Sequence, residues 1–198
     1  MTRLGDLGMI EYLLFEAFVE AIKHSQATVA EWLCDAAKFD VDQEMVKYPK
    51  RALFTALQDC STSHRYRTIE MILLKRADPN RTYAAVTGTP LQAALQMKEP
   101  DRQHIVDLLL SSGADPNART RKDVRRMRAP LLYAARRGEV DLLRNLFKHR
   151  ADPRVICRCL TIVDEAKRGK IREEVAEMLV EFGWEERFRD WARQRQSG

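Results

Sequence analysis

The sequence predicts an all-α protein made of about five stacked helix–turn–helix units, with a helical cap at each end. Three observations lead to this prediction. The motif Ala-Asp-Pro-Asn/Arg occurs three times at a fixed spacing of 37 residues, beginning at Ala77, Ala114 and Ala151. Each copy follows an apolar run with helical spacing, and each contains a proline that stops a helix. A fixed period of this length indicates stacked supersecondary units within a single domain over residues 1–198.

The unit at residues 88–118 shows the pattern most clearly. Thr89 is a favoured helix N-cap, and Pro90 suits the first helical position because its missing N–H would be unpaired there anyway. The second helix of the unit ends at Gly113, which favours the left-handed C-cap conformation. This helix has an apolar stripe at positions i, i+3 and i+4, formed by Ile105, Leu108 and Leu109.

The same succession of a first helix, a second helix and a turn predicts where the other units lie in the chain. They span residues 10–42, 51–81, 129–154 and 155–184. Residues 184–195 follow as a short amphipathic helix, which we expect to cover the last unit, because a terminal unit buries one face and exposes the other.

The first two units diverge most from the pattern. We expect a helix over most of Met1–Lys23, with the extra N-terminal residues covering the outer side of the first unit. A second helix would bury a stripe of Val29, Trp32 and Leu33, with Cys34 as a small core residue. Residues 59–67 are polar and predict a longer loop in the second unit.

The composition is that of a folded intracellular protein, either cytoplasmic or nuclear. Hydrophobic residues make up 45% and charged residues 32% of the chain, and the four cysteines are too scattered for a secreted disulfide framework. Glutamates interrupt the apolar N-terminal stretch, so we expect no signal peptide. No apolar stretch approaches the roughly 18 residues that span a bilayer, so we expect no membrane segment.

The unit pattern resembles the ankyrin repeat. The resemblance rests on Thr89-Pro90-Leu91-x-Ala93-Ala94 followed by Ile105–Asn117, and again on residues 129–152, with Gln92 and Leu132 in place of the family's histidine. It extends over roughly residues 16–184. It implies antiparallel helix pairs stacked in a curved solenoid, with finger loops at one edge and a concave surface that binds other proteins. It carries over no catalytic residue.

Positive charge is concentrated in one part of the chain. Residues 118–172 contain 17 Lys and Arg against 6 Asp and Glu, an excess of 11, although the net charge of the whole chain is only +5. The most basic stretch, residues 119–128, lies in the longer of the two predicted fingers. Arginine pairs bidentately with carboxylates and phosphates, so we expect an acidic partner. A solvated charged loop is the alternative interpretation.

We therefore predict a partner-binding surface made of the basic finger, the helix after it, and one tyrosine of the other finger, since Tyr and Arg are enriched at interface hot spots. Its predicted residues are Tyr83, Arg119, Arg121, Lys122, Arg125, Arg126, Arg128, Arg136 and Arg137.

Chemistry at a catalytic or metal site is not predicted. Cys157 and Cys159 lie near His149, and Cys60 lies near His64, but neither set supplies the four ligands of tetrahedral zinc. The chain has only 8 glycines, which are scattered, and no nucleophile or phosphate-loop motif. We expect no cofactor, no metal and no small-molecule substrate.

The leading hypothesis is a non-enzymatic adaptor that binds another protein through its concave face and fingers. The alternative is a nucleic-acid-associated protein that uses the basic segment 118–172, although aromatic residues for base stacking are missing among its finger arginines. A third hypothesis is a structural adaptor whose ends pack on further domains.

Overall fold

The structure is a computed structural model that describes residues 3–38, 40–42, 52–60, 64–82, 88–97, 102–118, 129–154 and 162–184. Within these residues every element is helical and there is no strand, which confirms the all-α prediction. The helices are α1 (Arg3–Lys23), α2 (Ala27–Ala37), α3 (Ala52–Gln58), α4 (Arg65–Leu74), α5 (Pro90–Leu95), α6 (Arg102–Ser111), α7 (Pro130–Arg137), α8 (Val140–Lys148), α9 (Ile162–Gly169) and α10 (Arg172–Glu181).

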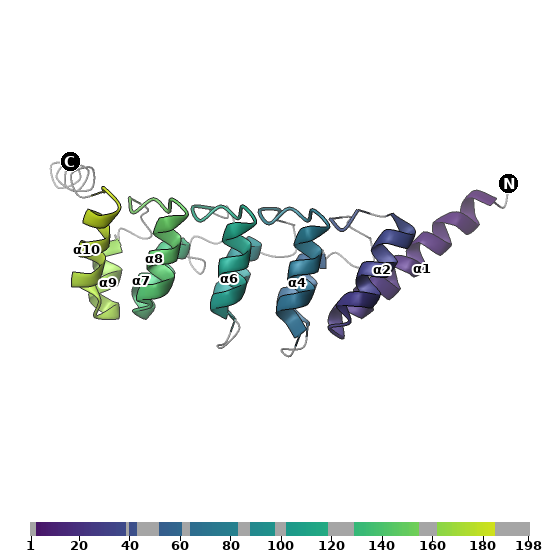
Figure 1. Cartoon of the computed structure of the whole chain (residues 1–198), viewed down its shortest axis with the longest axis horizontal. Coiled ribbons are helices and arrows are strands. Elements are labelled where there is room, and N and C mark those ends of the chain that lie inside the picture. Colours follow the sequence, from purple (N-terminus) through teal and green to yellow (C-terminus); the bar gives the residue numbers. More distant parts are fainter. Residues whose placement is uncertain are drawn as a thin grey trace.

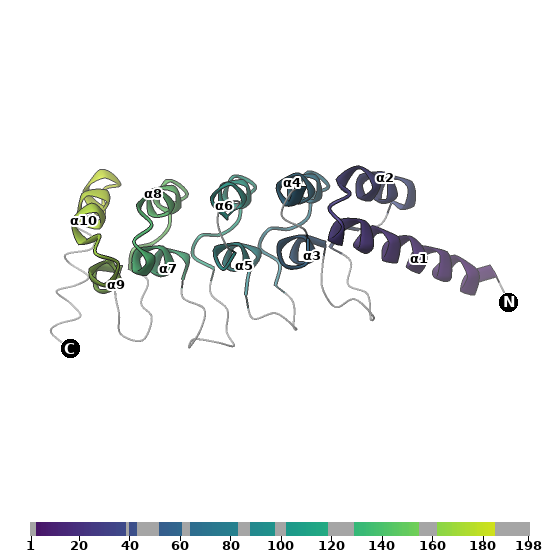
Figure 2. The same ribbon diagram turned by 90° about the horizontal axis from the view of Figure 1, so that it is seen from below.

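The helices form two parallel rows (Figures 1 and 2). The even-numbered helices make one row, here called the outer row, and the odd-numbered helices make the inner row. Each inner helix packs against the outer helix that follows it, and helices also contact their neighbours within a row. In Figure 1, α4, α6 and α8 lie nearly parallel in successive layers, as the repeated motif predicts.

The core lies between the rows and between successive pairs. All of α3 from Ala52 to Leu57 is buried, because this inner helix has neighbours on several sides. Leu109 of α6 and Leu146 of α8 have no exposed surface. The buried apolar residues of the described helix pairs form one continuous cluster, so each pair is stabilised by stacking on the next.

The turns that follow α4, α6 and α8 repeat one hydrogen-bonding arrangement. The Asp78 carboxylate accepts the backbone N–H of Asn80 at 2.9 Å, and the Asp115 carboxylate accepts that of Asn117 at 2.8 Å. The Asp152 carboxylate does the same for Arg154 at 2.9 Å. Such Asx turns fix a tight turn with one short side chain, so the repeated aspartate sets the shape of each turn.

The asparagines also tie each turn to the next one. The Asn80 amide donates to the Gly113 carbonyl at 2.8 Å, and its oxygen accepts the Asp115 N–H at 2.6 Å. Asn117 repeats both bonds one unit later. Its amide donates to the Arg150 carbonyl at 3.2 Å, and its oxygen accepts the Asp152 N–H at 2.7 Å. We call these two residues the asparagine bridges.

The residue before each turn has a left-handed backbone. Arg76, Gly113 and Arg150 have φ values of 67°, 90° and 65°, and Lys38 has 53°. Only one of the four is the glycine that this conformation favours. The repeat therefore imposes the left-handed conformation even where the residue opposes it.

Two expectations for the first units are wrong. Trp32 is 66% exposed and Val29 is 44% exposed, whereas α2 buries Ala27, Ala30, Leu33 and Cys34. Among the described residues, no helix precedes α2 in the outer row. Helix α4 begins at Arg65, inside the stretch predicted as loop. The predicted capping helix at residues 184–195 lies almost entirely outside the described residues.

Candidate protein-interaction surface

Most of the predicted binding residues lie outside the described part of the chain. These are Tyr83, Arg119, Arg121, Lys122, Arg125, Arg126 and Arg128. Arg136 and Arg137 are exposed at the C-terminal end of α7. The finger ends at Ala129, at the opposite end of this helix, about 10 Å away at 1.5 Å per residue. The structure thus places the two arginines apart from the point where the finger joins α7.

The start of this finger is held by the unit before it. The Thr89 hydroxyl accepts the Gln92 N–H at 3.3 Å, and the Gln92 side chain accepts the Thr89 N–H at 3.1 Å, which forms a capping box. The same glutamine donates to the Ala118 carbonyl at 3.2 Å. Gln92 therefore joins the start of α5 to the residue that precedes the basic finger.

Arg137 is fixed in an ionic cluster, whereas Arg136 is not. The Arg137 guanidinium donates to the Glu139 carboxylate and lies 5.5 Å from the centre of the Tyr133 ring. The bond to Glu139 raises the pKa of Arg137 further above its usual value. Glu139 also pairs with the buried Arg102 at 2.9 Å. Arg136 has no such partner among the described residues, so it is free to contact another molecule.

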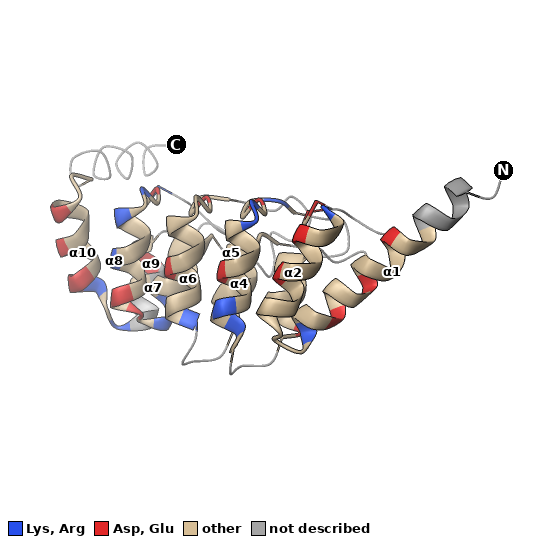
Figure 3. Cartoon of the chain, turned by 45° about the vertical axis from the view of Figure 1, so that its right-hand side comes forward, with Lys and Arg blue, Asp and Glu red and all other residues tan. Residues whose placement is uncertain are grey.

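Arg136 belongs to a series of basic residues along one edge of the array. We call this the hairpin edge: the last turn of each inner helix, the connection that follows it, and the first turn of each outer helix. Figure 3 marks basic residues in blue at the ends of several helices along it. Acidic residues also lie there, although Glu20 pairs with Lys23 and Glu139 pairs with two arginines. They are Glu20, Asp59, Glu139, Asp141, Glu173 and Glu174. The exposed or half-buried basic residues are Lys23, His24, His64, Arg65, Arg67, His104, Arg136, Arg137, Lys170 and Arg172.

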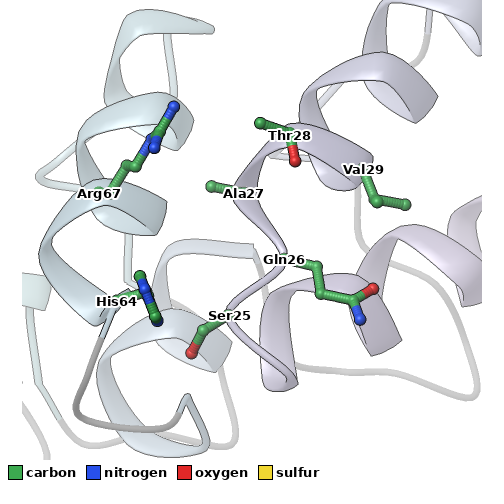
Figure 4. Close-up of a pocket in the computed structure, with 7 residues that line it drawn as sticks. All are labelled: Ser25, Gln26, Ala27, Thr28, Val29, His64 and Arg67. Atoms are coloured by element: carbon green, nitrogen blue, oxygen red, sulfur yellow. The ribbon is translucent and has the colours of Figure 1, made fainter.

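A cleft opens on the hairpin edge between the first two helix pairs (Figure 4). Its volume is about 360 Å³. One wall carries His64 and Arg67 from the start of α4, and the other is formed by residues 25–29 at the start of α2. The Arg67 guanidinium makes no ion pair with any described residue. The cleft is large enough for a side chain of a partner, with a positive charge on one wall.

The local backbone adds to this positive potential. Gln26 and His64 are the N-caps of α2 and α4, and neither side chain makes a capping hydrogen bond. Neither helix has an acidic residue in its first turn. Unpaired backbone N–H groups and the helix dipole both favour negative charge at such ends. Basic residues there are locally unfavourable, and a carboxylate from outside would relieve the repulsion.

Cysteine chemistry has little support at this edge. The buried Cys60 thiol lies 3.0 Å from the Ser25 hydroxyl, and burial raises the pKa of the Cys34 thiol. No cluster of three or more potential metal ligands occurs among the described residues. None of the described helices is both long and apolar enough to cross a membrane.

Antiparallel helix pairs in two rows, joined turn to turn by the asparagine bridges, define a helical-repeat protein. The ankyrin-repeat family model matches residues 88–121, which include the asparagine bridge of Asn117. This segment is an ankyrin repeat, and the family resemblance predicted from the sequence is confirmed. Ankyrin repeats generally mediate contacts between proteins and typically lack enzymatic activity. No curated protein matches the chain.

The cleft residues were missed by sequence reasoning, although the sequence contains a signal. Ser-His-Arg-Tyr-Arg over residues 63–67 looks like a loop because basic residues disfavour a helix start. The apolar positions Ile69 and Ile72 belong to a helix that nevertheless begins at Arg65. A basic segment directly before an apolar stripe would therefore have been the sign of a charged helix end.

Proposed function

We propose that the protein is a non-enzymatic interaction module, a solenoid of about five ankyrin units, which binds an acidic segment of a protein partner. The observation that carries the proposal is the hairpin edge, where Arg67 and Arg136 are exposed and unpaired among the described residues. Carboxylates of the partner would pair with these guanidinium groups.

The cleft gives the proposed contact its geometry. A partner glutamate placed between His64 and Arg67 would pair with Arg67 and lie close to the uncapped start of α4. Further carboxylates would reach Arg136 on the fourth helix pair. An extended acidic segment fits this arrangement better than one compact charge because the basic residues are spread along several units. Positive potential along the edge would also speed association.

The basic finger would provide a second set of contacts on the same partner. Its arginines lie outside the described residues, so this part of the proposal rests on the sequence pattern alone. As an adaptor, the protein would hold the acidic segment with its edge and use the finger to select among partners.

Charge reversal tests the proposal on the folded full-length chain. The probe is a fluorescent peptide of about 20 residues rich in glutamate and aspartate, measured by anisotropy at two salt concentrations. Arg67→Glu with Arg136→Glu should weaken binding about fivefold or more, since attraction becomes repulsion at both positions. Lys148→Glu makes the same charge change as either of these substitutions alone, at an exposed position near the turns, and should have little effect.

The alternative partner is tested in the same assay. A DNA duplex of similar charge should bind weakly, with affinity lost steeply as salt rises. If the duplex binds more tightly than the acidic peptide and the edge substitutions affect only the duplex, the partner is nucleic acid and the proposal is wrong. Equal peptide binding by the wild type and the edge variant would also refute it.

A further inference from the structure

Helix α1 extends well beyond the rest of the array. It has 21 residues, and its C-terminal half buries Phe15, Phe18 and Ile22 against its neighbours. The N-terminal half projects past α2 with no other described helix beside it (Figures 1 and 2). An exposed segment of this kind should be polar if it faces only water.

The projecting half is instead apolar on one side. Met9, Ile10 and Leu13 are 59%, 53% and 54% exposed. Residues three or four apart are neighbours on a helix surface, so Leu13 lies beside both Met9 and Ile10. Three large apolar side chains thus lie together on a surface that nothing in the described structure covers.

The same side of α1 becomes acidic toward its C-terminus. Met9, Leu13, Glu16 and Glu20 follow one another at spacings of four, three and four residues, which places all of them along one helix face. The Tyr12 hydroxyl lies 3.5 Å from Glu16, and Glu20 pairs with Lys23, but both glutamates remain partly exposed. Figure 3 marks acidic residues in red along this helix. We call Met9, Ile10, Leu13, Glu16 and Glu20 the α1 face.

The charge of the whole N-terminal region agrees with this pattern. Residues 1–42 contain eight acidic and three basic side chains, although the chain as a whole has a net charge of +5. Residues 1–42 thus have a net charge of 3 − 8 = −5, whereas the rest of the chain together has 5 − (−5) = +10. A partner of this face would need positive charge to complement it.

We infer that the α1 face docks a basic amphipathic helix of a protein partner. Apolar side chains of that helix would cover Met9, Ile10 and Leu13, and lysine or arginine side chains would pair with Glu16 and Glu20. The face is about 17 Å long from residue 9 to residue 20 at 1.5 Å per residue, so three turns of a partner helix match it.

A second copy of the chain complements the α1 face poorly. Parallel pairing of two α1 helices would place Glu16 and Glu20 against the same glutamates. Antiparallel pairing would place those carboxylates against Leu13 and Met9, where they would lose hydration without a partner. Charge thus favours a basic helix over self-association. The inference does not rest on the proposed function, which concerns a partner of opposite charge. The two surfaces meet where Glu20 of the α1 face pairs with Lys23 of the hairpin edge.

A designed peptide tests the inference directly. The probe has about 18 residues at helical spacing, with a leucine stripe along one half and lysines along the other. Binding to the full chain is measured by fluorescence anisotropy. The same peptide with glutamate in place of lysine should bind at least about tenfold more weakly, because it meets Glu16 and Glu20 with like charge.

Substitutions then locate the binding site. Met9→Ser with Leu13→Ser should weaken binding of the lysine peptide about tenfold or more, with an unchanged melting temperature because both side chains are exposed. Glu16→Lys with Glu20→Lys should reverse the preference between the two peptides. Leu74→Ser is the matched control, since Leu74 is an exposed leucine on another helix and is 78% accessible.

Two results would overturn the inference. The first is that Leu74→Ser weakens binding of the lysine peptide as much as the α1 substitutions do. The other is a dimer of the unliganded chain in sedimentation experiments that Met9→Ser with Leu13→Ser abolishes, because the occupant of the face would then be a second copy.

Discussion

Removing one asparagine bridge should lower the free energy of unfolding by an amount that follows from the hydrogen bonds lost. Asn117→Ala deletes the bond to the Arg150 carbonyl and the bond from the Asp152 N–H, while the helices on both sides stay the same. Each hydrogen bond contributes about 0.5–1.5 kcal/mol net, so the two together give about 1–3 kcal/mol. Asn117 is only half-buried, and water can replace part of the loss. We therefore expect about 1–2 kcal/mol.

The measurement is urea unfolding followed by circular dichroism, with the m-value compared between variants. Asn117→Asp is a useful second variant, because its carboxylate still accepts the Asp152 N–H but cannot donate to the Arg150 carbonyl. It also adds a charge beside two aspartates, so it should cost at least as much as the alanine substitution. Asn80→Ala should repeat the effect one unit earlier. The two losses should not be fully additive, because Asp115 donates its N–H to Asn80 and accepts the N–H of Asn117. A loss below about 0.5 kcal/mol for Asn117→Ala, with an unchanged m-value, would refute the reasoning.

Three more predictions concern the turns and the core. Arg150→Gly should raise the free energy of unfolding by about 0.5–1 kcal/mol, because φ is 65° at this residue. Gly113→Ala should lower it by about 1 kcal/mol through backbone strain alone, since nothing lies within 4 Å of the new Cβ. Urea melts that gave the opposite sign for either substitution would contradict the left-handed turn. Leu109→Ala should cost about 2–5 kcal/mol, because Leu109 is 0% exposed, and a loss below about 1 kcal/mol would show that it is not in the core. The pKa of Cys34 is raised by burial, so the folded state holds this proton more tightly than the unfolded state, and stability from this group should fall as pH rises past its ordinary value of 9.0. Native Cys34 should correspondingly react with a thiol reagent far more slowly than it does in urea, and equal rates would show that it is accessible.

The sequence was most informative where one unit resembles the next. Thr89 and Pro90 begin α5, and the left-handed Gly113 follows α6, as capping preferences predict. These features are local, and they recur because every internal unit has the same neighbours. The stripe of Ile105 and Leu109 is buried for the same reason.

Sequence reasoning failed where a unit lacks a neighbour. Val29 and Trp32 have apolar spacing typical of a buried stripe, but no described outer-row helix precedes α2, so they stay exposed. The bridges also could not be predicted, since Asn80 and Asn117 act on the turn of the following unit, more than 30 residues away. The cleft at His64 and Arg67 likewise depends on how two pairs stack.

The asparagine bridges span only adjacent turns, and this has a mechanical consequence. In a row of helix pairs joined mainly through nearest neighbours, few contacts between distant pairs hold the curvature fixed. Small rotations at successive joints accumulate, so the separation of the two ends can change by more than any single joint moves. Such a molecule would bend elastically along its length and could adapt to the surface of a bound partner, while each helix pair keeps its own fold.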